Sequence, residues 1–118
     1  MLIIKKQQIE QIKDHKLYDF ASTCQQLIKD EHPEIFKTRL EKDWNTFILA
    51  KIKAANTFGI YEAKSVYMYI LTLAKNPQYF HPRMPQWAVD ILTWPGRSEE
   101  NKILELCKEV YNLNQPSL

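Results

Sequence analysis

The sequence predicts an all-α protein, a single-domain bundle of about five helices that spans residues 1–118. Three observations favour this fold class. Apolar residues recur at steps of three and four along most of the chain, which is the period of one helix face. Only two of the 118 residues are glycine, and runs of β-branched residues are few. Prolines and glycines fall between the periodic segments, where they punctuate helices rather than interrupt them.

The size and composition suit one folded domain. A chain of 118 residues is the length of a single domain. It can bury roughly two-thirds of the surface that its unfolded state exposes, so it needs neither a disulfide nor a metal to fold. Hydrophobic residues make up 45% of the chain and charged residues 25%, as in ordinary globular proteins.

The first helix is predicted over residues 5–30, after a short apolar lead-in at 2–4 that we interpret as an extended arm. Its apolar stripe consists of Ile9, Ile12, Leu17, Phe20, Cys24, Leu27 and Ile28. The step of five from Ile12 to Leu17 indicates a change of face near Asp14-His15. A kink there and a division into two segments both stay open.

A second helix is predicted over residues 33–57, with a break near Thr38. Pro33 suits the first turn of a helix, because its missing N–H would have no partner there. Gly59 then stops the helix, since a glycine after the last periodic residue takes positive φ without a Cβ clash. We expect the next helix, over 62–75, to turn back antiparallel to the second.

The remaining chain alternates short helices with loops. Residues 76–85 hold three prolines and form the longest irregular stretch predicted. The fourth helix covers 85–93 and ends at Trp94-Pro95-Gly96. Ser98 is a favourable N-cap for a fifth helix, whose apolar face runs from Ile103 to Tyr111. The tail at 114–118 is expected to fray.

Charge and hydropathy limit the classes of partner. Sixteen basic and 14 acidic residues give a net charge of +2, with both signs mixed along the chain. Nucleic-acid binding favours a concentrated basic face, whereas the longest basic run is Lys5-Lys6. No run approaches the roughly 18 apolar residues of a membrane span, and no signal peptide is recognisable. We therefore expect no nucleic-acid partner, no membrane insertion and a cytoplasmic location.

The two cysteines, Cys24 and Cys107, lie far apart on predicted helices between apolar neighbours. This placement is typical of buried thiols rather than of a disulfide framework. A bridge between them stays open as an alternative.

The sequence contains no recognisable metal site. None of His15, His32 and His81 has a second ligand at the spacing of a known motif, and Asp19, four residues after His15, comes nearest. We expect no metal and no cofactor.

Catalytic residues are not predicted either. Ser22, Ser65 and Ser98 fit helix or capping positions better than the place of a nucleophile. Two isolated glycines exclude a glycine-rich phosphate loop. The carboxylates Glu99-Glu100 and Glu105-Glu109 are expected to be solvated on an exposed helix. We therefore predict that the protein is not an enzyme.

Aromatic residues gather between positions 61 and 94, and two interpretations of them stay open. The first is that the third helix is central and buried on all sides. The second is that the segment forms a surface for a protein partner, because Tyr, Trp and Arg are favoured in such contacts. For the second interpretation, the candidate partner-binding residues are Tyr79, Phe80, Arg83 and Trp87.

From residue 56 onward the chain resembles a family of small uncharacterised helical bacterial proteins encoded beside type VI secretion spike and effector genes. The shared motifs are residues 54–60 (AANTFGI), Glu62, the apolar helix at 66–73, Tyr79-Phe80 and residues 85–92 (PQWAVDIL). The chain departs from the family pattern in the loop, at 75–77 and at His81-Pro82. The N-terminal half matches only in its general style.

The resemblance implies a non-enzymatic protein-binding role, as a cytoplasmic adaptor or chaperone for a type VI secretion effector or spike component. The alternative is an immunity protein that neutralises a cognate toxin. The even charge distribution favours the adaptor, because an immunity protein often carries one strongly charged face.

Overall fold

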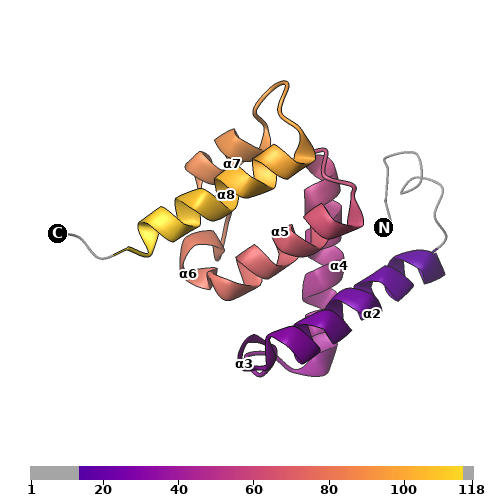
Figure 1. Ribbon diagram of the computed structural model, residues 1–118. Coiled ribbons are helices and arrows are strands. Elements are labelled where there is room, and N and C mark those ends of the chain that lie inside the picture. Colours follow the sequence, from indigo (N-terminus) through magenta and orange to yellow (C-terminus); the bar gives the residue numbers. More distant parts are fainter. Residues whose placement is uncertain (1–13, 116–118) are drawn as a thin grey trace.

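The computed structural model describes residues 14–115, which form seven α-helices (Figure 1). These are α2 (Asp14–Glu31), α3 (Pro33–Phe36), α4 (Glu41–Thr57), α5 (Ala63–Lys75), α6 (Pro77–Phe80), α7 (Gln86–Leu92) and α8 (Glu99–Leu113). The all-α class is confirmed, but the expected number of about five helices was too low. The second predicted helix is two helices, and the predicted loop at 76–85 begins with the short helix α6.

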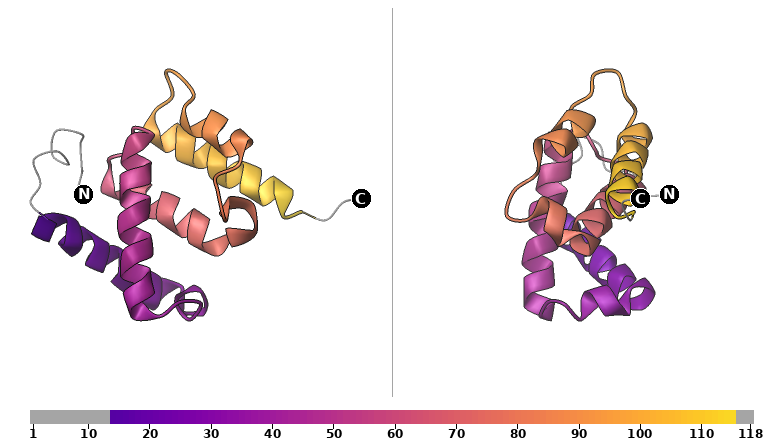
Figure 2. Two further views of the ribbon diagram at one scale, coloured as in Figure 1. Left: turned by 180° about the vertical axis from the view of Figure 1, so that it is seen from behind. Right: turned by 90° about the vertical axis from the view of Figure 1, so that its left-hand side faces the viewer.

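Helix α5 lies at the centre of the molecule. It packs against α4 on one side and α8 on the other, with α2 beside α4 and α7 beside α8 (Figures 1 and 2). Eight of its 13 residues are buried: Ser65, Val66, Tyr69, Ile70, Leu71, Thr72, Leu73 and Ala74. This confirms that the third predicted helix is central, because an element covered on several sides needs apolar side chains around most of its surface.

The chain turns from α4 into α5 at a corner formed by residues 58–62, which we call the Gly59 corner. Gly59 has a φ of 79°, as predicted for a residue that ends a helix in the left-handed conformation. The Ile60 amide donates to the carbonyl of Ala55 at 2.9 Å, and the Gly59 amide donates to that of Asn56 at 3.0 Å. These two bonds satisfy carbonyls at the end of α4 that have no partner within the helix.

The helices on either side of the Gly59 corner are not antiparallel. In all three views α5 crosses α4 steeply (Figures 1 and 2). The expected antiparallel pairing was therefore wrong, and α5 contacts α6 and α8 as well as α4.

Helix α8 is bonded to the Gly59 corner through two side chains. Glu99 Oε1 accepts hydrogen bonds from the backbone amides of Tyr61 at 2.6 Å and Glu62 at 2.8 Å. Lys102 Nζ donates to the Phe58 carbonyl at 2.9 Å. The expectation that Glu99 is simply solvated was therefore wrong, because its carboxylate binds amide groups that precede α5.

The break predicted near Thr38 separates α3 from α4. Trp44 is fully buried, and its indole Nε1 donates to the Phe36 carbonyl at 2.8 Å. The rings of Phe36 and Trp44 also stack, with centroids 5.8 Å apart. These contacts hold the α3 turn against the first turn of α4. The N-cap predicted at Ser98 is also confirmed, since its side chain accepts a bond from the Asn101 amide.

Three expectations fall wholly or partly outside the described residues. They are the arm at 2–4, the first helix before Asp14 with the change of face near Asp14-His15, and the end of the tail at 116–118. Among the helices that the structure describes, none combines the length and the apolar composition that crossing a bilayer requires.

Candidate functional site

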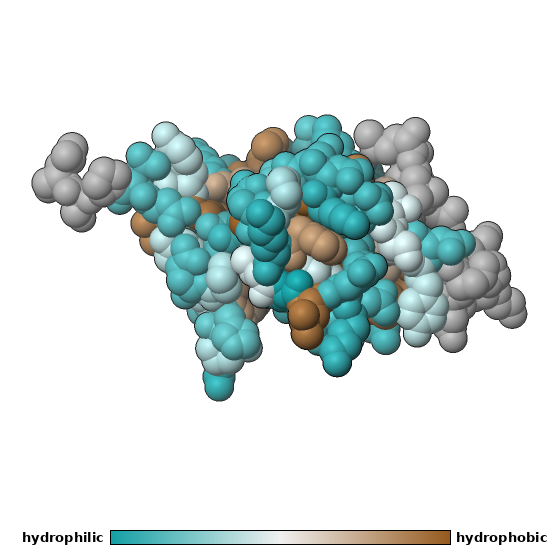
Figure 3. All heavy atoms as spheres, turned by 90° about the horizontal axis from the view of Figure 1, so that it is seen from below, coloured by the Kyte–Doolittle hydropathy of each residue, from teal (hydrophilic) through white to brown (hydrophobic). Residues whose placement is uncertain are grey.

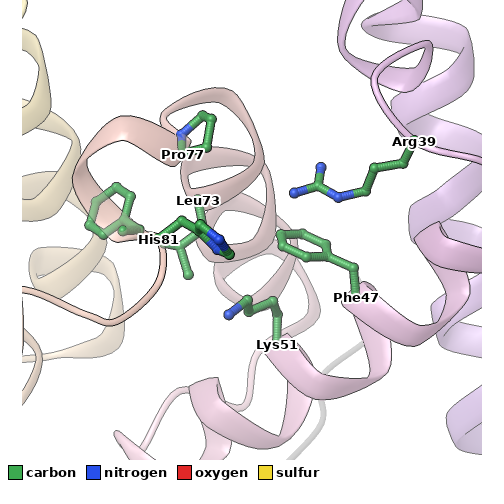
Figure 4. Close-up of a pocket in the computed structure, with 7 residues that line it drawn as sticks. Arg39, Phe47, Lys51, Leu73, Pro77 and His81 are labelled. Atoms are coloured by element: carbon green, nitrogen blue, oxygen red, sulfur yellow. The ribbon is translucent and has the colours of Figure 1, made fainter.

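A cleft opens between α4 and the turn that joins α5 to α6 (Figure 4). Its volume is about 220 Å³. It is lined by Arg39, Phe47, Lys51, Leu73, Pro77, Phe80 and His81, and we call it the Phe47 cleft. The lining combines cationic or ionisable nitrogen groups with apolar side chains, and both kinds come from each of two segments, 39–51 and 73–81, that are distant in the sequence.

Arg39 reaches the cleft from the break between α3 and α4. Its guanidinium carbon lies 4.1 Å from the centroid of the Phe47 ring and 4.8 Å from that of Trp44. The two rings meet edge to face, and Trp44 is fixed in the core. Contact with aromatic faces both stabilises a cation and restricts where it points. The guanidinium is therefore positioned before any ligand arrives.

Lys51 lies one helical turn after Phe47 on α4. Its Nζ is 5.4 Å from the Phe47 ring centroid, so Arg39 and Lys51 share one aromatic ring (Figure 4). Burial lowers the pKa of Lys51, and the nearby charge of Arg39 lowers it further. Burial also lowers the pKa of Arg39, while the charge of Asp43 opposes that change.

No carboxylate pairs with either cation among the side chains that the structure describes. The one contact within 4.0 Å between a basic and an acidic side chain in that part of the chain joins His32 Nδ1 to Glu34 Oε1, at 3.8 Å. Arg39 and Lys51 are both half-buried, so each has lost part of its hydration without gaining a full counter-charge. Two like charges in this state favour the approach of an anion.

His81 and Phe80 come to the cleft from the segment that the sequence singled out. Figure 4 shows the His81 imidazole extending toward the Phe47 ring and Lys51. Phe80 is 7% exposed, and Leu73 beside it is 3% exposed. These apolar side chains form part of the cleft wall and continue into the core.

The four predicted partner-binding residues occupy different environments. Phe80 is buried, Tyr79 and Trp87 are half-buried, and Arg83 is exposed. The Phe80 ring lies 5.8 Å from that of Trp87 and 6.5 Å from that of Tyr79. The Tyr79 hydroxyl donates to Asn114 Oδ1 at 2.8 Å, which links α6 to the end of α8. The structure thus brings three of them together, with Phe80 alone among the four lining the Phe47 cleft, and their role in binding stays a prediction.

Sequence reasoning missed Arg39 and Lys51. Part of the signal was available, because Trp44, Phe47 and Lys51 follow one another at steps of three and four and so share one side of a helix. The position of Arg39 had no such signal. It depends on the path of the chain through the break after α3.

A second hollow lies beside the loop between α7 and α8. It is lined by Asp90, Ile91, Thr93, Trp94 and Pro95. Trp94 is 43% exposed, and the guanidinium carbon of Arg97 lies 3.7 Å from the Trp94 centroid. This loop projects from the body of the molecule (Figure 1). The opposite face is mainly hydrophilic, with hydrophobic atoms in small separate patches (Figure 3).

Cysteine and histidine side chains take part in no metal-ligand cluster in the part of the chain that the structure describes. Cys24 and Cys107 are both free thiols, and burial raises the pKa of Cys24 to about 12, which makes it a poor nucleophile. Over the same residues, no group of three or more His, Cys, Asp and Glu side chains lies close enough to hold a metal ion.

No protein-family model, curated protein or solved structure matches this chain. The motifs behind the resemblance to proteins encoded near type VI secretion genes have structural roles here. Residues 54–60 form the end of α4 and the first part of the Gly59 corner, and Ala88 and Leu92 of the motif at 85–92 are buried in the core. These motifs therefore describe packing, and the cleft cations Arg39 and Lys51 lie outside them.

Proposed function

We propose that the protein is a non-enzymatic accessory protein that binds another protein, as a cytoplasmic adaptor or chaperone for a type VI secretion effector or spike component. The observation that supports binding is the Phe47 cleft, in which two cations held on aromatic rings lack a carboxylate partner among the described residues. Arginine and aromatic side chains are favoured where proteins meet. The resemblance in motifs supports the link to type VI secretion.

The cleft suits recognition better than catalysis. Its lining holds one imidazole, from His81, but no hydroxyl, thiol or carboxylate that would act with it as nucleophile or orienting group. Its volume of about 220 Å³ is below the roughly 300–1,000 Å³ of most small-molecule sites. It has room for one or two side chains of a partner rather than for a substrate enclosed from water.

An immunity protein is the second candidate, and a different feature favours it. The projecting loop between α7 and α8 presents Trp94 with Arg97 stacked on it. A tryptophan backed by an arginine on a protruding loop can enter the active-site cleft of a toxin and contribute much of the binding energy.

Co-purification tests the proposal and separates the two candidates. The tagged protein is expressed in the cells that encode it, and captured proteins are identified by mass spectrometry. We expect a secretion effector or spike component, captured less well by the Arg39→Gln/Lys51→Gln variant. Capture of a toxin that the protein inhibits, lost in Trp94→Ala and kept in the cleft variant, would favour the immunity role.

Recovery of no specific protein from cells that make the candidate partners would contradict both roles. Lys53→Gln is the matched control, because Lys53 is an exposed lysine on the same helix as Lys51 but does not line the cleft. It should capture as much partner as the unmodified protein.

A further inference from the structure

The Phe47 cleft also indicates what kind of partner segment it recognises. We propose that it binds an acidic side chain, Asp or Glu, of a partner segment, together with an apolar side chain next to it. This inference rests on the proposed protein-binding function and specifies its chemistry.

The positive charge of the Phe47 cleft is complementary to the negative charge of an acidic side chain. Arg39 and Lys51 both face the Phe47 ring. Among the described residues, no carboxylate lies within ion-pair distance of either one. A carboxylate in the cleft gains a charge-assisted hydrogen bond from a cation that it reaches, and its charge offsets the repulsion between the two half-buried cations. The planar guanidinium of Arg39 is shaped for two parallel bonds to one carboxylate.

The apolar part of the lining of the Phe47 cleft favours an apolar side chain next to the acidic one. The segment from α5 to α6 contributes the uncharged side chains Leu73, Pro77 and Phe80 to the lining, together with the imidazole of His81. An isolated inorganic anion would gain nothing from these uncharged side chains, whereas a peptide can place an apolar residue there and its acidic residue at the cations. The apolar contact then excludes water, which strengthens the ionic contact beside it.

The size and the apolar lining of the cleft favour a carboxylate over a phosphate group. The cleft holds about 220 Å³, and much of its lining is apolar. A phosphate carries close to two negative charges near neutral pH, so its transfer into such a site costs more hydration energy than that of a singly charged carboxylate. An unmodified acidic segment is thus the occupant that fits size and charge together.

The direct test is an NMR titration of the full-length ¹⁵N-labelled protein with the tripeptide acetyl-Leu-Glu-Phe-amide. We expect saturable shifts of the backbone amides of Phe47, Lys51 and His81. The matched probe acetyl-Leu-Gln-Phe-amide has the same shape without the charge. It should bind at least about tenfold more weakly, the effect of losing one charge-assisted contact of about 1.4 kcal/mol.

Two variants test whether Arg39 and Lys51 cause the preference for the Glu peptide. Arg39→Gln/Lys51→Gln should lose the preference for the Glu peptide, whereas Lys53→Gln should keep it. The melting temperature of each variant is measured first. If the double variant fails to fold, the two peptides are still compared on the unmodified protein. Their relative affinities and the positions of the shifted amides then show whether the cleft recognises the negative charge.

Three outcomes would overturn the proposal. Equal binding of the Glu and Gln peptides would show that charge is not recognised. Sodium sulfate that produces the same shifts with equal affinity would identify a site for free anions. Shifts confined to residues outside the cleft would place recognition elsewhere.

The outcome of co-purification separates this inference from the proposed function. If the double variant captures the same partner as well as the unmodified protein does, the acidic specificity is wrong but the protein-binding role stands. If no partner is captured while the two peptides differ as expected, the recognition chemistry stands and the accessory role is wrong.

Discussion

Gly59 has a positive φ, a backbone conformation that residues with a side chain rarely adopt. A Cβ added at this position would meet only Lys102 Nζ, at 3.6 Å, which is ordinary contact. The cost of a substitution therefore comes from the positive φ. We expect Gly59→Ala to lower the free energy of unfolding by about 1 kcal/mol, measured by urea denaturation. Lys53→Ala, at an exposed helical site, should change it by less than about 0.5 kcal/mol.

An unchanged denaturation midpoint for Gly59→Ala would contradict the left-handed conformation. Gly96→Ala offers a second comparison, because Gly96 also has a positive φ, of 76°, with no atom within 4 Å of the added Cβ. It should cost a similar amount through strain alone.

Phe80 and Arg83 lie three positions apart but differ fully in burial. Phe80 contacts the core and the Trp87 ring, whereas Arg83 is exposed. We expect Phe80→Ala to destabilise the protein by roughly 3–5 kcal/mol, the range for removing a buried phenyl ring. Arg83→Ala should cost less than about 0.5 kcal/mol.

Circular dichroism melts of the two variants give the measurement, with partner capture assayed on the same preparations. Similar melting temperatures for both would mean that Phe80 is not part of the core. A stable Arg83→Ala protein that no longer captures partner would support Arg83 as a binding residue.

At the scale of elements, α8 depends on specific bonds as well as on apolar packing. Glu99 accepts from two backbone amides, whereas the neighbouring Glu100 is exposed in the same first turn. We expect Glu99→Ala to cost about 2 kcal/mol, typical for hydrogen bonds to a charged group. Glu99→Gln keeps an acceptor oxygen and should lose less.

Glu100→Ala is the matched control for the Glu99 variants, because it removes a charge of equal benefit to the helix dipole. Chemical denaturation of the three variants gives the comparison. Equal losses for Glu99→Ala and Glu100→Ala would show that the bonds to the Gly59 corner add no stability.

The elements that the sequence predicted well are those with local causes. Gly59 and Ser98 each act on the helix end next to them. The apolar period of α5 can be read from the sequence, and it indicates that the helix is buried. The steep crossing of α4 and α5 was not predictable in this way, because the angle between two helices is set by tertiary packing and leaves no periodic signal in either helix. Arg39 became part of a cleft for the same reason, through a tertiary path without a periodic signal.

For the whole molecule, two buried groups predict sensitivity to alkali. Burial raises the pKa of Cys24 from 9.0 to about 12 and that of Tyr69 from 10.0 to about 12. Both hold their protons more tightly in the folded chain. Their contribution to the free energy of unfolding is therefore complete below about pH 9 and declines as the pH rises toward 12.

Urea denaturation at a series of pH values measures this decline. Tyr69→Phe should reduce the slope above about pH 10, where the unfolded chain loses the tyrosine proton. Its stability at pH 7 should be little changed, because the Tyr69 hydroxyl is buried without a hydrogen-bond partner in the described part of the chain. A flat stability profile up to pH 11 would contradict the predicted pKa values.

The bonds between α8 and the Gly59 corner also affect the order in which the protein can fold during its synthesis. Glu99 follows Tyr61 by 38 residues, and Lys102 follows Phe58 by 44. While the ribosome is still making the segment between them, the exposed amides and carbonyl of the corner have only water as a partner. We therefore expect the corner to close only after residues 99–102 have left the exit tunnel, so that α4 and α5 do not complete it on their own during synthesis.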